Sequence, residues 1–178
     1  MSLTDLASLG SFVSGIAVLV SLIYLSLQIR QNTHLHRATA HKVRADFVTE
    51  FLQQQLDPSV AAAVLRGVAG DSSMSEVEFT QFNAITHAWF VGMSELYWLH
   101  DQGVLDEDTF TGSDTALRLR LQSPGVRAVW QIVKPMMPEP FRVNVDKVIA
   151  ENPPVPLNNP FERWKSELRA QSAGTAAA

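Results

Sequence analysis

The strongest candidates for chemistry are two titratable side chains, His87 and Glu95, in one largely apolar segment. They are eight positions apart, which puts them on one face of a helix, whereas His100 is five positions beyond Glu95 and falls on another face. A glutamate buried in such a segment needs a partner for its charge. Three arginines that follow in the chain could supply one: Arg118, Arg120 and Arg127. We therefore expect a structural ion pair or, as the alternative, a ligand-binding or proton-handling site.

Other residue patterns that perform chemistry are missing from the sequence. The chain of 178 residues has no cysteine, which excludes disulfides, thiolate catalysis and cysteine-based metal sites. It has no glycine-rich phosphate loop, no nucleophile elbow and no Glu-x-x-His pair of a metal-binding bundle. The adjacent acids Asp106, Glu107 and Asp108 suit the start of a helix, where they cap it and complement its dipole. We expect a protein that is not an enzyme and that has no metal or other cofactor.

Residues 6–29 form an uncharged and mostly apolar segment. A helix needs about 20 such residues to cross a lipid bilayer, so the segment predicts a transmembrane helix. The preceding residues carry Asp5 and no lysine or arginine, which argues against a cleaved signal peptide. The net charge of −4 includes no basic excess of the kind that binds nucleic acid, so the bilayer is the expected partner.

Basic residues follow the apolar segment and set its expected direction. Arg30, Arg37, Lys42 and Arg44 come after it, whereas Asp5 is the one charge before it. The positive-inside rule then puts the N-terminus outside and the C-terminal bulk of the chain in the cytoplasm. The four basic side chains would lie against anionic lipid headgroups.

One face of the predicted transmembrane helix consists of small residues, and they are Gly10, Ser14, Ala17 and Ser21. In lipid, small residues at this spacing let two helices approach closely, and serines can bond across the contact. We therefore expect a homo-oligomer or an integral membrane partner protein. An alternative interpretation makes this face, together with Gln28, the lining of a small homo-oligomeric channel.

The expected fold is all-α, with one N-terminal transmembrane helix that extends into a cytoplasmic helical bundle. Between residues 11 and 56 only Gly15 could interrupt a helix, so the span should continue as one long helix. Proline, glycine and capping residues then divide the cytoplasmic domain, residues 30–152. We expect helices over 58–67, 76–102, 106–122, 126–136 and 141–151. Residues 117–121 and 143–145 alternate as strands do, but no other segment could complete a sheet.

The C-terminal region is expected to contain a proline-rich linker over 153–160, a short amphipathic helix over 161–171 and a disordered tail over 172–178. Phe161, Trp164 and Leu168 recur on one face of that helix. A helix of this length is marginal alone in water. We expect it to dock on its own domain, on a neighbouring subunit or on the bilayer surface.

Several stretches resemble a widespread group of short bacterial single-span membrane proteins. The first is VSLIYLSLQIRQNT at 20–33, and the others are GVLDED at 103–108, SPGVRAVW at 123–130 and PFR at 140–142. The resemblance covers residues 10–150 and implies a bacterial source, an inner-membrane location and a helical domain in the cytoplasm. The direction given by the flanking charges puts residues 1–5 outside. The group has no established catalytic or binding residues.

The sequence therefore predicts a membrane-anchored, non-enzymatic assembly or accessory subunit of an inner-membrane complex. One alternative is a small channel or membrane effector. The other is a ligand sensor or an enzyme centred on Glu95 and His87.

Overall fold

The computed structural model of the chain describes the backbone of residues 3–154 and 160–175, and the side chains of residues 12, 14–29, 31, 38–154 and 161–172. Over these residues it contains seven α-helices, one short 3-10 helix and no strand. The expected all-α fold is therefore confirmed for this part of the chain. The chain divides after Asp46 into two compact units.

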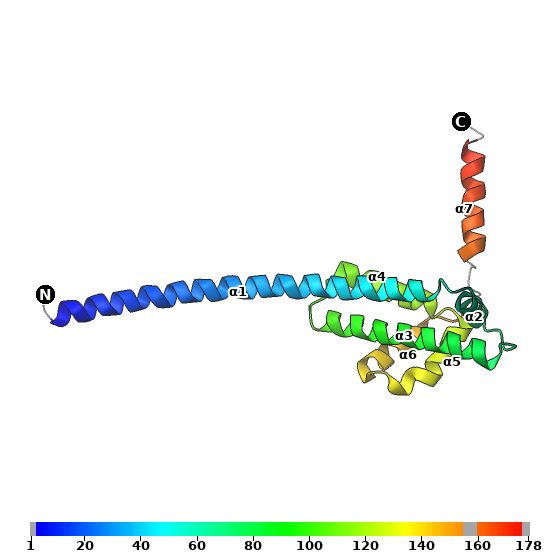
Figure 1. Ribbon diagram of the computed structural model, residues 1–178, viewed down its shortest axis with the longest axis horizontal. Coiled ribbons are helices and arrows are strands. Elements are labelled where there is room, and N and C mark those ends of the chain that lie inside the picture. Colours follow the sequence, from blue (N-terminus) through cyan, green and yellow to red (C-terminus); the bar gives the residue numbers. More distant parts are fainter. Residues whose placement is uncertain (1–2, 155–159, 176–178) are drawn as a thin grey trace. The chain divides into compact units, whose positions relative to one another are not determined.

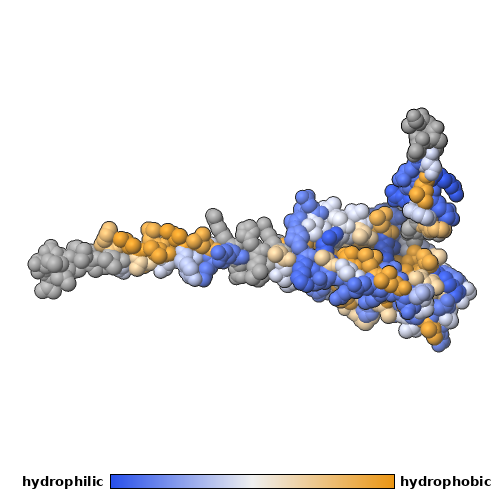
Figure 2. Space-filling model, turned by 45° about the horizontal axis from the view of Figure 1, so that its top comes forward, coloured by the Kyte–Doolittle hydropathy of each residue, from blue (hydrophilic) through white to orange (hydrophobic). Residues whose placement is uncertain are grey.

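The first unit consists of the N-terminal part of α1, which as a whole runs Leu3–Gln54. Its large apolar side chains between Phe12 and Ile29 are 49% to 67% exposed, and Figure 2 shows the apolar surface that they form. Within the described residues, no helix combines the length and the apolarity that a membrane span requires. The structure thus supports one long helix from the N-terminus, but not its expected transmembrane part over 6–29.

The second unit begins at Phe47 and contains the remaining helices in chain order (Figure 1). They are α2 Pro58–Ala69, α3 Glu76–Asp101, α4 Glu107–Arg120, α5 Pro124–Val133, the 3-10 helix η1 Lys134–Met136, α6 Glu139–Glu151 and α7 Pro160–Thr175.

Side-chain caps set where these helices begin. The Asp57 carboxylate accepts hydrogen bonds from the first backbone amides of α2, with Pro58 as the first helical residue. Ser75 and Glu78 form a reciprocal capping box at the start of α3. The Asp106 carboxylate accepts a hydrogen bond from the Thr109 amide at the start of α4. Gly70 then ends α2 with a φ of 75°, a backbone conformation that glycine adopts without strain.

Helix α3 is the central element of this unit, because α2, α4 and α5 all pack against it. Figure 1 shows α3 running along the middle of the domain. Its buried Phe90 lies 4.9 Å from the Trp130 ring of α5, and Trp130 meets Phe141 of α6 edge to face at 6.0 Å. These aromatic contacts join three helices in one core.

Several helix boundaries differ from the expected ones. Helix α2 ends at Ala69 instead of residue 67. Helix α5 begins at Pro124 instead of residue 126, because Ser123 caps it, and it ends at Val133, where the 3-10 helix follows. Helix α6 begins at Glu139 instead of Phe141, because Pro140 lies in its first turn, where a proline has no hydrogen bond to lose. Helix α7 continues to Thr175, beyond the expected end at residue 171 and into the segment 172–178 that we expected to be disordered. Residues 176–178 lie outside the described part.

Candidate functional site

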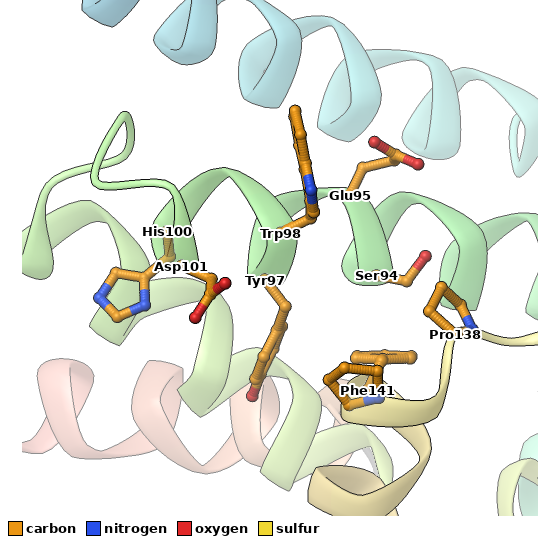
Figure 3. Close-up of a pocket in the computed structure, with 9 residues that line it drawn as sticks. Ser94, Glu95, Tyr97, Trp98, His100, Asp101, Pro138 and Phe141 are labelled. Carbon is orange, nitrogen blue, oxygen red and sulfur yellow. The ribbon is translucent and has the colours of Figure 1, made fainter.

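A groove of about 410 Å³ lies along the C-terminal half of α3 and the start of α6. From α3 it is lined by Ser94, Glu95, Tyr97, Trp98, His100 and Asp101. Pro138, Pro140 and Phe141 close it on the other side. In Figure 3 the Glu95 and Trp98 side chains extend from one side of α3, and Tyr97 extends from the opposite side. The lining thus combines aromatic rings with two carboxylates, and it contains no lysine or arginine.

The Tyr97 hydroxyl forms part of the contact between α3 and α4. It donates a hydrogen bond to the Asp114 carboxylate, which also accepts one from Nε of Arg118 at 2.6 Å. Burial and the hydrogen bond to Asp114 raise the pKa of Tyr97 well above its ordinary value. The phenol therefore stays neutral and serves as a donor, and it supplies neither a base nor a nucleophile.

His100 and Ser94 also have structural partners. Nε2 of His100 lies 2.9 Å from the Glu107 carboxylate at the start of α4, and its ring stacks on Phe110 with 3.7 Å between centroids. The Ser94 hydroxyl donates to the Val91 carbonyl of its own helix at 2.7 Å. A nucleophilic serine needs a base within hydrogen-bond reach, and this hydroxyl has none. The groove is therefore suited to binding, and its aromatic and acidic lining favours a cationic or aromatic occupant.

The structure corrects the expected buried pair of His87 and Glu95. Glu95 is exposed and lines the groove, whereas His87 is half-buried and is not among the groove residues. The expected ion pair between Glu95 and an arginine is absent from the described contacts, since each arginine that we considered is engaged elsewhere. Arg118 bonds Asp114, Arg120 lies between aromatic rings, and Arg127 bonds backbone carbonyls. The apolar segment around Glu95 is not buried as a whole, since Trp98 is also 58% exposed.

Arg120 is an unusual feature of the core. Its guanidinium lies 4.8 Å from the Phe51 ring centroid of α1 and 5.1 Å from that of Trp89. Its Nε and Nη2 atoms are buried and find no hydrogen-bond partner in the described part of the chain. Burial lowers the pKa of Arg120 to about 10. The aromatic faces replace part of the lost hydration of this cation, so Arg120 belongs to the core and does not form an accessible site.

The SPGVRAVW stretch at 123–130 also joins helices. The Ser123 hydroxyl accepts from the Val126 amide at the start of α5 and donates to the Val68 carbonyl of α2 at 2.6 Å. Gly125 lies so close to α2 that an added Cβ would be 1.7 Å from the Gly67 carbonyl oxygen. This part of the motif therefore holds α5 against the end of α2.

The second half of the same stretch holds α6. The Arg127 guanidinium donates to the carbonyls of Leu121 and of Asn152, just after α6. Nε1 of Trp130 donates to the Asp146 carboxylate of α6 at 2.9 Å. Arg127 and Trp130 are therefore occupied in maintaining the fold.

The residues predicted for membrane packing lie in the first unit. Ser14, Ala17 and Ser21 are exposed, and the Ser21 hydroxyl donates to the Ala17 carbonyl of its own helix at 2.9 Å. Gly10 falls outside the described side chains. The side-chain amide of Gln28 likewise finds a partner on the same helix, the Tyr24 hydroxyl at 2.7 Å.

The predicted basic cluster is described only in part. Lys42 forms an ion pair with Asp46 at 2.5 Å, and Arg44 is half-buried. Arg30 and Arg37 fall outside the described side chains. At the other end of the chain, the predicted docking residues Phe161, Trp164 and Leu168 are 55%, 56% and 42% exposed.

Comparison of the chain with protein-family models, with curated proteins and with solved structures found no match. Among the described residues, no three histidine, aspartate or glutamate side chains are grouped so that they could hold a metal ion. Sequence reasoning found Glu95, but it set His100 aside on another helix face and missed Trp98, Asp101 and Phe141 as groove residues. The sequence signal for Trp98 and Asp101 was their helical spacing from Ser94, whereas nothing in the sequence placed Phe141 beside them.

Proposed function

We propose that the chain is a membrane-anchored, non-enzymatic accessory subunit of a bacterial inner-membrane complex. The observation that carries the proposal is the uncharged segment 6–29, together with the exposed apolar side chains between Phe12 and Ile29. Soluble proteins rarely expose a contiguous apolar surface of this size. Moving these side chains from water into lipid would contribute on the order of 10 kcal/mol or more. In this proposal the N-terminus lies outside and the helical bundle lies in the cytoplasm.

Self-association or a partner helix would use the face that contains Gly10, Ser14, Ala17 and Ser21. Small side chains there permit close packing without hydrogen bonds between helices. The hydroxyl of Ser21 and the amide of Gln28 have partners on their own helix, so neither group requires a water-filled lining. This favours a packing face over the alternative of a channel.

A second function, recognition of a ligand, is favoured by the groove on α3. Glu95 and Asp101 present negative charge beside the exposed ring of Trp98. The alternative of a sensor is therefore centred on the groove and no longer on His87. An enzyme is disfavoured because Ser94, Tyr97 and His100 are all engaged in structural hydrogen bonds.

The anchor is tested by expressing the full chain in a bacterium and washing the isolated membranes with alkaline carbonate. The wild-type chain should resist extraction, because lipid surrounds its apolar segment. Leu22→Arg puts a charge into that segment, costs about 2.5–3.5 kcal/mol at the centre of a span, and should reduce the membrane-bound fraction. Leu65→Arg is the matched control, since Leu65 is similarly exposed but lies on α2. A wild-type chain that carbonate releases would refute the anchor.

Direction and assembly need separate measurements. Because the chain has no cysteine, a single cysteine at Ser2 or at Ser172 reports the side of the membrane through a reagent that cannot cross it. Label at Ser2 and not at Ser172 in intact spheroplasts is the expected result. Native mass spectrometry of the detergent-extracted complex then distinguishes a homo-oligomer from a complex with a foreign subunit, and a monomer would refute the accessory role.

A further inference from the structure

Helix α7 has an apolar face that the described contacts leave exposed. Trp164 and Leu168 are 56% and 42% exposed, and the Phe161 ring stacks beside Trp164 at 5.7 Å. Figure 2 shows apolar residues among hydrophilic ones on this helix. A helix of 16 residues is marginal alone in water, so burial of this face would stabilise it.

The groove on α3 has the chemistry that matches this face. Trp98 offers a 58% exposed ring that is suited to aromatic contacts, whereas Phe141 borders the groove but is itself buried. Glu95 and Asp101 give the groove a negative charge, and its lining contains no lysine or arginine. The occupant it suits is therefore aromatic and carries positive charge.

Helix α7 meets both requirements. It has three basic residues, Arg163, Lys165 and Arg169, against two acidic ones. Lys165 already pairs with Glu162 on the same helix at 2.7 Å, which leaves Arg163 and Arg169 for the groove carboxylates. Both arginines flank the apolar face in sequence.

The chain between α6 and α7 is long enough for this contact. The groove lies at the start of α6, and α6 has 13 residues, so its length is about 20 Å at 1.5 Å per residue. Residues 152–159 are eight in number and span at most about 26–29 Å when extended. This exceeds the length of α6, so the first turn of α7 can return to the groove of the same chain.

We propose that α7 binds the α3–α6 groove of its own chain, with Phe161 and Trp164 against the exposed ring of Trp98. In this state α7 is an internal cover, and a partner that uses the groove must first displace it. The proposal concerns the second unit alone and holds whether or not α1 enters a bilayer.

Hydrogen–deuterium exchange of the full chain in mild detergent tests the proposal. If α7 is docked in the wild-type chain, its backbone amides should exchange at least tenfold more slowly there than in the variant Trp98→Ala. Because Trp98 is 58% exposed, this variant should keep the fold, which unchanged exchange in α5 verifies. Leu119→Ala, a change at a 56% exposed residue of α4, is the matched control and should leave α7 as in the wild type. The double variant Glu95→Lys with Asp101→Lys should release α7 through charge alone.

Three outcomes would overturn the proposal. Exchange in wild-type α7 that is as fast as in Trp98→Ala shows that the groove is empty. Protection that disappears on dilution shows that α7 binds a second copy of the chain. Protection that appears only with vesicles containing anionic lipid shows that α7 lies on the membrane.

Discussion

The contact between α2 and α5 predicts that Gly125→Ala is among the most damaging single-methyl additions to this fold. The new Cβ would be 1.7 Å from the Gly67 carbonyl oxygen and 2.8 Å from its carbonyl carbon. Real Cβ contacts are at least 3.0 Å, so the two helices must separate by about 1.3 Å at this point. The obstacle is backbone on both sides, and no side chain can turn away to relieve it.

The expected loss in free energy of unfolding follows from two contributions. Overpacking of this kind costs about 1–3 kcal/mol. Separation of the helices also stretches the 2.6 Å hydrogen bond from Ser123 to the Val68 carbonyl, which is worth about 1 kcal/mol. Together they predict a loss of about 3 kcal/mol, which for a domain of this size lowers Tm by about 10 °C.

The measurement is thermal unfolding of the full chain in mild detergent, followed by tryptophan emission. Trp130 reports the transition directly, because it is fully buried and lies on α5, the helix that contains Gly125. Gly103→Ala is the control: its φ of 67° gives backbone strain, but nothing lies within 4 Å of the added methyl. Its expected cost is about 1–2 kcal/mol. A Tm for Gly125→Ala equal to or above that of Gly103→Ala would refute the reasoning.

Three further variants test other contacts by the same unfolding measurement. Gly92→Ala adds a methyl 2.0 Å from a half-buried phenylalanine ring that can turn aside, so it should cost about 1–2 kcal/mol, and a loss above that of Gly125→Ala would contradict this. Arg120→Met removes a buried, unpaired cation but keeps its length, so stability should stay equal or rise by about 1 kcal/mol; a marked loss would reveal a partner for the guanidinium. The Ser73 hydroxyl and the Arg66 guanidinium lower the pKa of Asp71 to about 2. Its ionised form therefore stabilises the fold above pH 3.8, and this contribution is lost as the pH falls through about 2. Asp71→Asn should flatten the loss of Tm between pH 4 and 2, and an unchanged slope would show that the pair contributes nothing.

Helix positions could be predicted because their signals are local. Asp57 and Pro58 mark a helix start by the chemistry of the cap and the fixed φ of proline, without reference to the rest of the fold. The same holds for Ser75 with Glu78. The alternating stretch 117–121 was correctly placed in a helix up to Arg120, because a strand there would have lacked any partner.

The exposure of Glu95 could not be predicted from the sequence, because one side of the apolar stretch around it faces the core and the other faces solvent. Met93 and Leu96 face the core, whereas Val91 and Trp98 lie with Glu95 on the exposed side. Hydropathy alone does not distinguish a tryptophan that is buried in the core from one that is exposed and lines a groove. The groove itself requires Phe141, which the chain brings to α3 from more than forty positions away, and no local pattern records such a contact.

In the second unit, the residues that hold the helices together differ from the residues that line the groove, and this difference indicates which substitutions should affect function. In the stretch 123–130, each of four residues makes a contact between helices: Ser123, Gly125, Arg127 and Trp130. Substituting them should lower Tm and disturb function only through the loss of the fold. The groove residues have the opposite character, because Trp98, Glu95 and Asp101 are exposed and add little to the core. A variant that keeps its Tm but changes partner binding is therefore expected at Trp98 and not at Trp130, although both are tryptophans of the same bundle.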